Sequence, residues 1–189
     1  MRQFIITLCV MLASLTVNAQ EHLSFKGIPI EGSISTFCQK LKAKGLTQIH
    51  SEDNIRLFTG DFTGRDATIG VIADQFGKNV FSVVVLLPKN DEWNSLVNTY
   101  DYYKDLYIEK YGKPSFSKEN NPSRSDSNFS LMHELYEGKV VYGCVFDVSG
   151  GNIELTIDKA DGYLQGQVII RYKDALNIQG KRQADLDEI

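Results

Sequence analysis

The chain has 189 residues, of which 42% are hydrophobic and 11% aromatic, so it carries enough apolar side chains to bury a core and does not have a disordered composition. The formal net charge is -4 and the isoelectric point is about 5.4, which leaves no basic field to hold nucleic acid phosphates or an anionic membrane surface. The composition therefore argues against nucleic acid as a partner, and the length allows one domain or two small ones.

The first 19 residues have the layout of a secretory signal peptide. Arg2 gives a positive start, an apolar run covers residues 4–15, and small residues precede a cleavage site between Ala19 and Gln20. The apolar run is too short to cross a bilayer and remain there, and no later stretch is long enough to span one. We therefore expect a soluble exported protein, periplasmic or extracellular. The alternative, a buried N-terminal helix, stays open.

The first predicted α+β unit covers residues 20–90. Residues 23–32 form a short extended piece, and Ser33 then has the position of a helix N-cap. Four apolar residues with the spacing of one helix face follow it, and Gly45 supplies the helix stop. These four residues are Ile34, Phe37, Cys38 and Leu41. Strands are predicted at 54–62, 66–74 and 80–88.

The second predicted unit, residues 91–175, opens with a helix that contains five tyrosines within residues 98–114. An apolar face at helical spacing runs from Trp93 to the helix end at Gly112. Four of the tyrosines lie on this face, which predicts that they belong to the core: Tyr100, Tyr103, Tyr107 and Tyr111. Tyr102 lies on the opposite face with Leu106, where the two could contact the other half of the protein or a partner.

The remainder of the second unit is predicted as strands around a polar insertion at 119–128. A polar tail, residues 176–189, follows the last strand. The expected strands are 114–118, 129–137, 139–148, 153–159 and 163–173. A helix followed by antiparallel strands therefore occurs twice, which indicates an internal duplication; two merely similar patterns are the alternative. Either way the fold class is α+β, with helices packed on a largely antiparallel sheet.

No catalytic, cofactor-binding or metal-ligating residue is predicted. The three histidines outside the signal peptide are too far apart in sequence to share one turn of a helix, and the chain has no CxxC pattern. Export would permit a disulfide between Cys38 and Cys144, but their apolar neighbours favour buried free thiols. We therefore expect a protein that is not an enzyme and uses no cofactor.

Four segments carry a resemblance to known proteins. "FKGIPIEGSISTFCQKLKAKG", "LFTGDFTGRDATIGV", "LYIEKYGKPS" and "GGNIELTI" together resemble a group of uncharacterised exported proteins of gut-type Gram-negative bacteria. The resemblance covers nearly the whole chain after the predicted cleavage site and implies export but no activity. The tandem of helix and four strands also resembles beta-lactamase inhibitor protein, in layout alone, and a likeness of fold does not carry a function across.

Two classes of function agree with these observations. The first is non-catalytic binding of an envelope or secreted protein through a sheet face or loops, with a possible interaction surface of Phe76, Tyr102, Leu106 and Tyr136. The alternative is a small-molecule carrier or a hydrolase that uses a cleft between the two halves. A flat apolar patch would favour the first class, and a sizeable pocket with convergent polar groups would favour the second.

Overall fold

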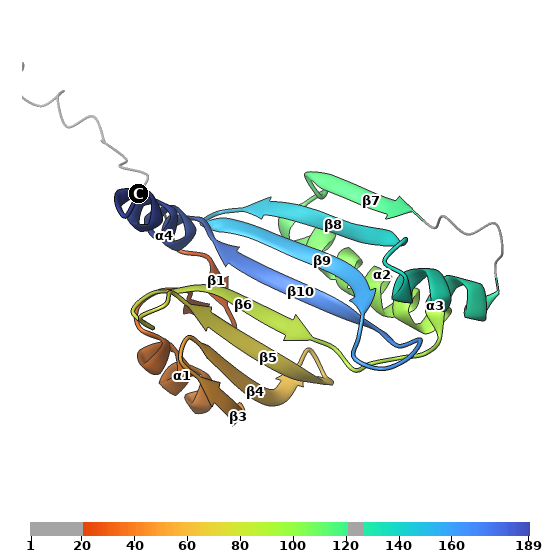
Figure 1. Cartoon of the computed structure of the whole chain (residues 1–189), viewed down its shortest axis with the longest axis horizontal. Helices are drawn as coiled ribbons and strands as arrows, with labels where there is room; N and C mark the ends of the chain where they lie inside the picture. Colours follow the sequence, from red (N-terminus) through yellow and green to blue (C-terminus); the bar gives the residue numbers. More distant parts are fainter. Residues whose placement is uncertain (1–20, 121–126) are drawn as a thin grey trace, which may run out of the picture.

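The computed structural model describes residues 21–120 and 127–189, which form an α+β fold (Figure 1). Within these ranges eight strands form one antiparallel sheet in the order β3-β4-β5-β6-β10-β9-β8-β7, and two short strands form a separate hairpin. The predicted fold class is therefore confirmed. The predicted cleavage site between Ala19 and Gln20 lies outside the described residues. No helix in the described part of the chain is long and apolar enough to cross a membrane.

The elements follow one another along the chain as two comparable series. They are β1 (Ser24–Phe25), β2 (Ile28–Pro29), α1 (Ile34–Ala43), β3 (Thr47–Glu52), β4 (Ile55–Phe62), β5 (Arg65–Ala73), β6 (Val80–Leu86), α2 (Trp93–Tyr111), β7 (Phe116–Asn120), α3 (Asn128–Tyr136), β8 (Val141–Val148), β9 (Gly151–Lys159), β10 (Gly166–Asp174) and α4 (Ala175–Asp187). Each half thus supplies a helix and four strands, and α3 is inserted between β7 and β8. The halves join where β6 pairs with β10, with Val83 opposite Tyr172.

Helices α1 and α2 and the β1-β2 hairpin pack on the same face of the sheet. Helix α1 contacts β5, and α2 contacts β8, β9 and β10. From the hairpin, the Phe25 ring stacks on Phe62 of β4 with centroids 6.0 Å apart and meets the edge of Tyr172 of β10 at 5.2 Å. Helices α3 and α4 lie at opposite ends of the strands of the second half (Figure 1). These contacts build one continuous core across both halves.

The two long predicted helices are present, and their apolar faces are buried. Helix α1 begins at Ser33, whose hydroxyl accepts a hydrogen bond from the Thr36 N–H at 3.2 Å. In α2, the side chains of Tyr100, Tyr103 and Tyr107 are buried. Tyr111 is half-buried against the same core, which confirms that the aromatic stripe packs inward.

The predicted strand at 129–137 is wrong, because these residues form helix α3. The Ser127 hydroxyl caps the helix by accepting from the Ser130 N–H at 3.2 Å. Leu131, Met132 and Leu135 are buried on one side, a spacing that suits a helix. Leu131 and Leu135 are also an even number of residues apart, so the same residues fit the two-residue period of a strand.

The C-terminal residues 176–189 were predicted as a polar tail, and most of them form helix α4. Asp174 caps this helix, because its carboxylate accepts a hydrogen bond from the Asn177 N–H at 2.9 Å. None of the residues of α4 is buried, which explains why the segment has no apolar periodicity. The two cysteines, Cys38 and Cys144, are buried free thiols.

Candidate functional site

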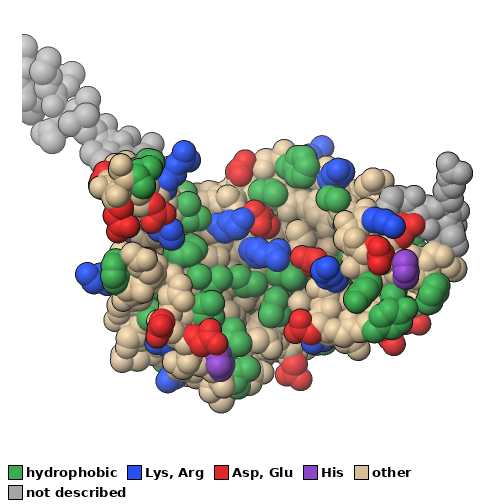
Figure 2. Space-filling view, in the orientation of Figure 1, with side chains coloured by type: hydrophobic (Ala, Val, Ile, Leu, Met, Phe, Trp, Pro, Cys, Tyr) green, Lys and Arg blue, Asp and Glu red, His purple; other side chains and the backbone are tan. Residues whose placement is uncertain are grey.

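Among the described residues no helix covers one face of the eight-stranded sheet, and Figure 2 shows the surface of this face. In β5, for example, Ile69 and Val71 are buried under the helices, so Gly70 and Ile72 face the other way. We call this surface the open face. Antiparallel sheets with one solvated face commonly carry polar residues on it.

In the first half and along β10, the open face carries aliphatic residues beside threonines such as Thr59 and Thr68, and we call these aliphatic residues the apolar half. The pairing places Leu57 beside Gly70, and Gly70 beside Val84, so that two aliphatic side chains lie on either side of a glycine in one row. Most of the aliphatic side chains here are half-buried. The residues of this apolar half are Ile55, Leu57, Ile72, Val84, Leu86 and Ile169.

A band of paired charges borders the apolar half on β10 and β9. Lys173 Nζ donates a hydrogen bond to Glu154 of β9, and the Arg171 guanidinium donates to the Thr156 hydroxyl at 3.1 Å. The same guanidinium lies 3.9 Å from the Asp158 carboxylate. The charges therefore satisfy one another across the strands, and they form a polar rim beside the apolar residues.

Beyond this band, the open face has a hollow of about 240 Å³ at Gly143. Because Gly143 has no side chain, the surface sinks between its neighbours; an added Cβ would lie 2.9 Å from the Leu155 carbonyl oxygen. Phe116 and Val141, which are 58% and 47% exposed, stand at the edge of the hollow. A second hollow of about 250 Å³ lies near Leu86.

On the helix side of the sheet, a groove runs between α2 and the β1-β2 hairpin. It consists of two cavities of about 590 and 660 Å³, and four residues line both of them. These four shared residues are Lys26, Tyr107, Lys110 and Tyr172. We call this feature the tyrosine groove, and the region of the shared residues its junction. Its lining comes from both halves of the chain.

Local structure fixes the residues of the junction. Lys26 and Gly27 form the two-residue turn of the hairpin with φ values of 50° and 75°, the left-handed conformations that such a turn requires. The Lys26 ammonium donates to the Asp61 carbonyl oxygen at 2.9 Å. The hydroxyls of Tyr107 and Tyr172 are 2.5 Å apart and hydrogen bonded. Burial raises the pKa of both tyrosines, so both hydroxyls stay protonated.

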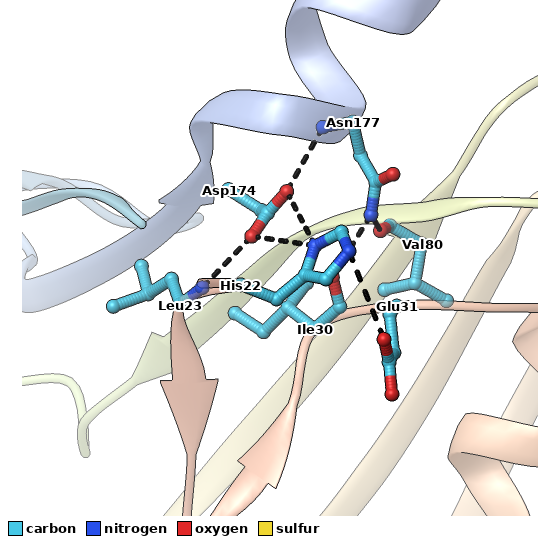
Figure 3. A network of polar contacts seen from close by, with 7 residues as sticks. All are labelled: His22, Leu23, Ile30, Glu31, Val80, Asp174 and Asn177. Carbon is cyan, nitrogen blue, oxygen red and sulfur yellow. Dashed lines mark hydrogen bonds and ion pairs between the residues drawn. The ribbon is translucent and has the colours of Figure 1, made fainter. Parts of the chain in front are cut away.

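A buried polar network beside the groove is structural. Asp174 is 0% exposed, and its carboxylate accepts hydrogen bonds from the Leu23 N–H at 2.8 Å and from the His22 ring at 3.1 Å (Figure 3). The Asn177 side chain donates to the carbonyl oxygens of Ile30 and Val80 at 2.9 and 2.8 Å. The network therefore ties the N-terminal segment to the start of α4.

A second polar cluster lies under β7. Glu119 accepts hydrogen bonds from Lys104 at 2.5 Å, from Ser117 at 2.9 Å and from Tyr100 at 3.0 Å. Burial raises the pKa of Glu119, but these hydrogen bonds outweigh it and the net shift is downward. Nearby Cys144 is buried, which raises the pKa of its thiol. In the described ranges no three side chains of His, Cys, Asp or Glu gather where they would hold a metal ion.

The structure places the predicted interaction residues in three separate regions. Tyr102 and Leu106 lie one turn apart on α2, where Arg65 stacks over the Tyr102 ring at 5.5 Å and Leu106 lines the tyrosine groove. Phe76 is 69% exposed in the β5-β6 turn and faces α4 across a small cavity. Tyr136, at the end of α3, packs against Tyr163 with ring centroids 5.5 Å apart.

The open face and the junction of the groove were not predicted from the sequence. A signal for the open face existed in "VFSVVVLLP", whose unbroken apolar run predicts a strand with apolar residues on both faces. The residues of the junction come from positions far apart in the chain. Only the tertiary structure brings Lys26 close to Lys110.

Comparisons of the chain with protein-family models, with curated proteins and with solved structures find no match. Both resemblances therefore stay predictions.

Proposed function

We propose that this chain is an exported, non-catalytic binding protein that holds a partner protein against its open face. The observation that carries the proposal is the group of aliphatic residues on a sheet face that no described helix covers. Contiguous apolar surface bordered by polar residues is characteristic of protein interaction sites.

The open face is large enough for such an interface. Its six inner strands have seven to nine residues each. Eight strands about 4.8 Å apart span roughly 35 Å, and strands of this length extend about 25 Å, which gives a face of roughly 900 Å². Stable protein interfaces bury about 800 Å² on each partner. The face as a whole would therefore serve as one side of an interface of ordinary size.

The open face has a hollow that would receive a side chain of a partner. The hollow at Gly143 would receive one protruding apolar or aromatic side chain, since Phe116 and Val141 supply apolar walls. Anchors in such pockets commonly contribute most of the binding energy of an interface. The paired charges of Arg171 and Lys173 would stay at the edge of the contact, where they contribute orientation more than affinity.

Affinity capture from the envelope and culture medium of the host tests this proposal. Val84→Lys places a charge in the apolar half, and Phe116→Lys does the same at the hollow. Phe129→Lys is the matched control, because Phe129 is an exposed aromatic residue on α3. We expect one protein to be captured by the unmodified chain and by the control but lost with both open-face variants. Equal capture by all three variants, with melting temperatures unchanged, would refute the proposal.

A further inference from the structure

The tyrosine groove has the size and lining of a small-molecule site. Its cavities of about 590 and 660 Å³ fall within the range of about 300–1,000 Å³ that is usual for ligand pockets. The groove lies on the helix side of the sheet, so a ligand there would not compete with a partner on the open face. The binding of such a ligand is therefore independent of the proposed function.

The floor of the junction offers an unused hydrogen-bond donor. The hydroxyls of Tyr107 and Tyr172 carry two protons, and the hydrogen bond between them uses one. Among the described residues neither hydroxyl has another hydrogen-bond partner. The second proton is therefore free to meet an acceptor atom in the groove, and buried donors that lack a partner carry a free-energy cost.

Two lysines line the groove together with this donor. Lys26 and Lys110 line both cavities, and neither forms an ion pair with a carboxylate of the described residues. Each acidic lining residue belongs to one cavity alone: Glu109 to the smaller, and Glu21 and Asp147 to the larger. The charged residues among the four that line both cavities are therefore both lysines, and the carboxylates that line one cavity each would repel a second negative charge on a ligand.

The smaller cavity supplies an apolar wall beside the junction. Phe62 and Tyr103 contribute aromatic rings, and Leu106 is 38% exposed on the same side of α2. Covering an exposed leucine with an apolar group removes both from water, which favours binding. The groove thus combines a junction that has two lysines and a free hydroxyl donor with an adjacent apolar surface.

We propose that the tyrosine groove binds a small amphipathic molecule with a single negative charge, namely a carboxylate attached to an apolar chain or ring. The carboxylate lies between Lys26 and Lys110 and accepts the free proton of the tyrosine pair. The apolar body extends along Leu106. Charge-assisted hydrogen bonds of this kind are about twice as strong as neutral ones, so the anionic group dominates the choice of ligand.

Displacement of a fluorescent probe measures this binding. The probe is 8-anilinonaphthalene-1-sulfonate, itself an amphipathic molecule with one negative charge, and the competitors are decanoate and its uncharged counterpart, decanol. We expect decanoate to displace the probe from one saturable site, and decanol to require at least a tenfold higher concentration. Equal potency of the two competitors would overturn the proposal, because the groove would then select for apolar area alone.

Variants locate the site. Lys26→Gln combined with Lys110→Gln should weaken decanoate at least tenfold, and Leu106→Glu should do the same by placing a carboxylate on the apolar wall. The matched control combines Lys44→Gln with Lys159→Gln, two exposed lysines outside the groove, which changes the net charge equally. Melting temperatures report whether each variant is folded. Decanoate affinity that is equal in the lysine pair and its control would overturn the proposal.

Discussion

The replacement of Asp174 by alanine gives the sharpest test of the structure itself. The carboxylate is fully buried, caps α4 through the Asn177 N–H and accepts a hydrogen bond from the Leu23 N–H. Loss of a helix N-cap costs about 1 kcal/mol. A buried N–H left without a partner costs a further 1–3 kcal/mol, roughly. We therefore expect Asp174→Ala to lower the free energy of unfolding by about 2–4 kcal/mol.

Denaturation in urea, followed by circular dichroism and extrapolated to zero denaturant, measures this change. His22→Ala is the control, since it removes the half-buried ring that donates to Asp174 but keeps the cap and the Leu23 hydrogen bond. The control should lose less than about 1 kcal/mol, as for a typical net hydrogen bond. A loss in Asp174→Ala no larger than that in His22→Ala would contradict the roles of the Asp174 carboxylate as helix cap and as acceptor for the Leu23 N–H.

Three further predictions follow from other contacts. Gly150→Ala should lower the melting temperature more than Gly64→Ala does. Both glycines have φ near 80°, but only at Gly150 would an added Cβ lie 2.3 Å from the Glu21 carbonyl oxygen. Equal losses in melting temperature would contradict this close approach. Tyr107→Phe and Tyr172→Phe should be non-additive in a double-mutant cycle, with a coupling of about 1 kcal/mol, and additive effects would contradict the hydroxyl pair. Since the pKa of Glu119 is lowered from 4.5 in the folded state, its hydrogen bonds stabilise the protein fully above that pH. The stability difference between the protein and Glu119→Gln should shrink as the pH falls below 4.5, and a difference that is constant down to pH 3 would contradict the shift.

Helices α1 and α2 were predictable from the sequence, because buried residues recur at helical spacing along each of them. Helix α1 combines an N-cap at Ser33 with a buried face that recurs at three and four residues. In α2 the same periodicity runs from Trp93 to Tyr107, and Gly112 ends the helix with a φ of 86°. Local spacing and tertiary burial agree in these segments.

Segments that are short or mostly exposed were not predictable in the same way, because they lack a long buried face. Strand β3, Thr47–Glu52, lies at an edge of the sheet and is mostly exposed, so its sequence shows no apolar alternation and no strand was predicted there. In α3, nine residues are too few for the strand and helix periods to diverge clearly. Helix α4 has no buried residue and depends on the cap at Asp174, which residue spacing does not reveal.

The candidate surfaces depend on register and on contacts between distant residues. Apolar residues in β6 were evident, but only strand pairing shows that Val84 has Gly70 on one side and Arg171 on the other. The tyrosine stripe of α2 was correctly predicted as core. Its inner residues nevertheless reach the floor of a groove, because Tyr107 meets Tyr172 from the last strand, 65 residues further along the chain.

Site-specific photo-crosslinking in the host would test the open face most directly. A photoreactive amino acid replaces Thr68 or Thr156, half-buried residues on two strands of the open face, or Lys42, an exposed residue of α1 on the helix side. If the open face is the binding surface, the first two positions crosslink to the same protein and Lys42 does not. A crosslink from Lys42 alone, with none from Thr68 or Thr156, would contradict the proposed binding surface.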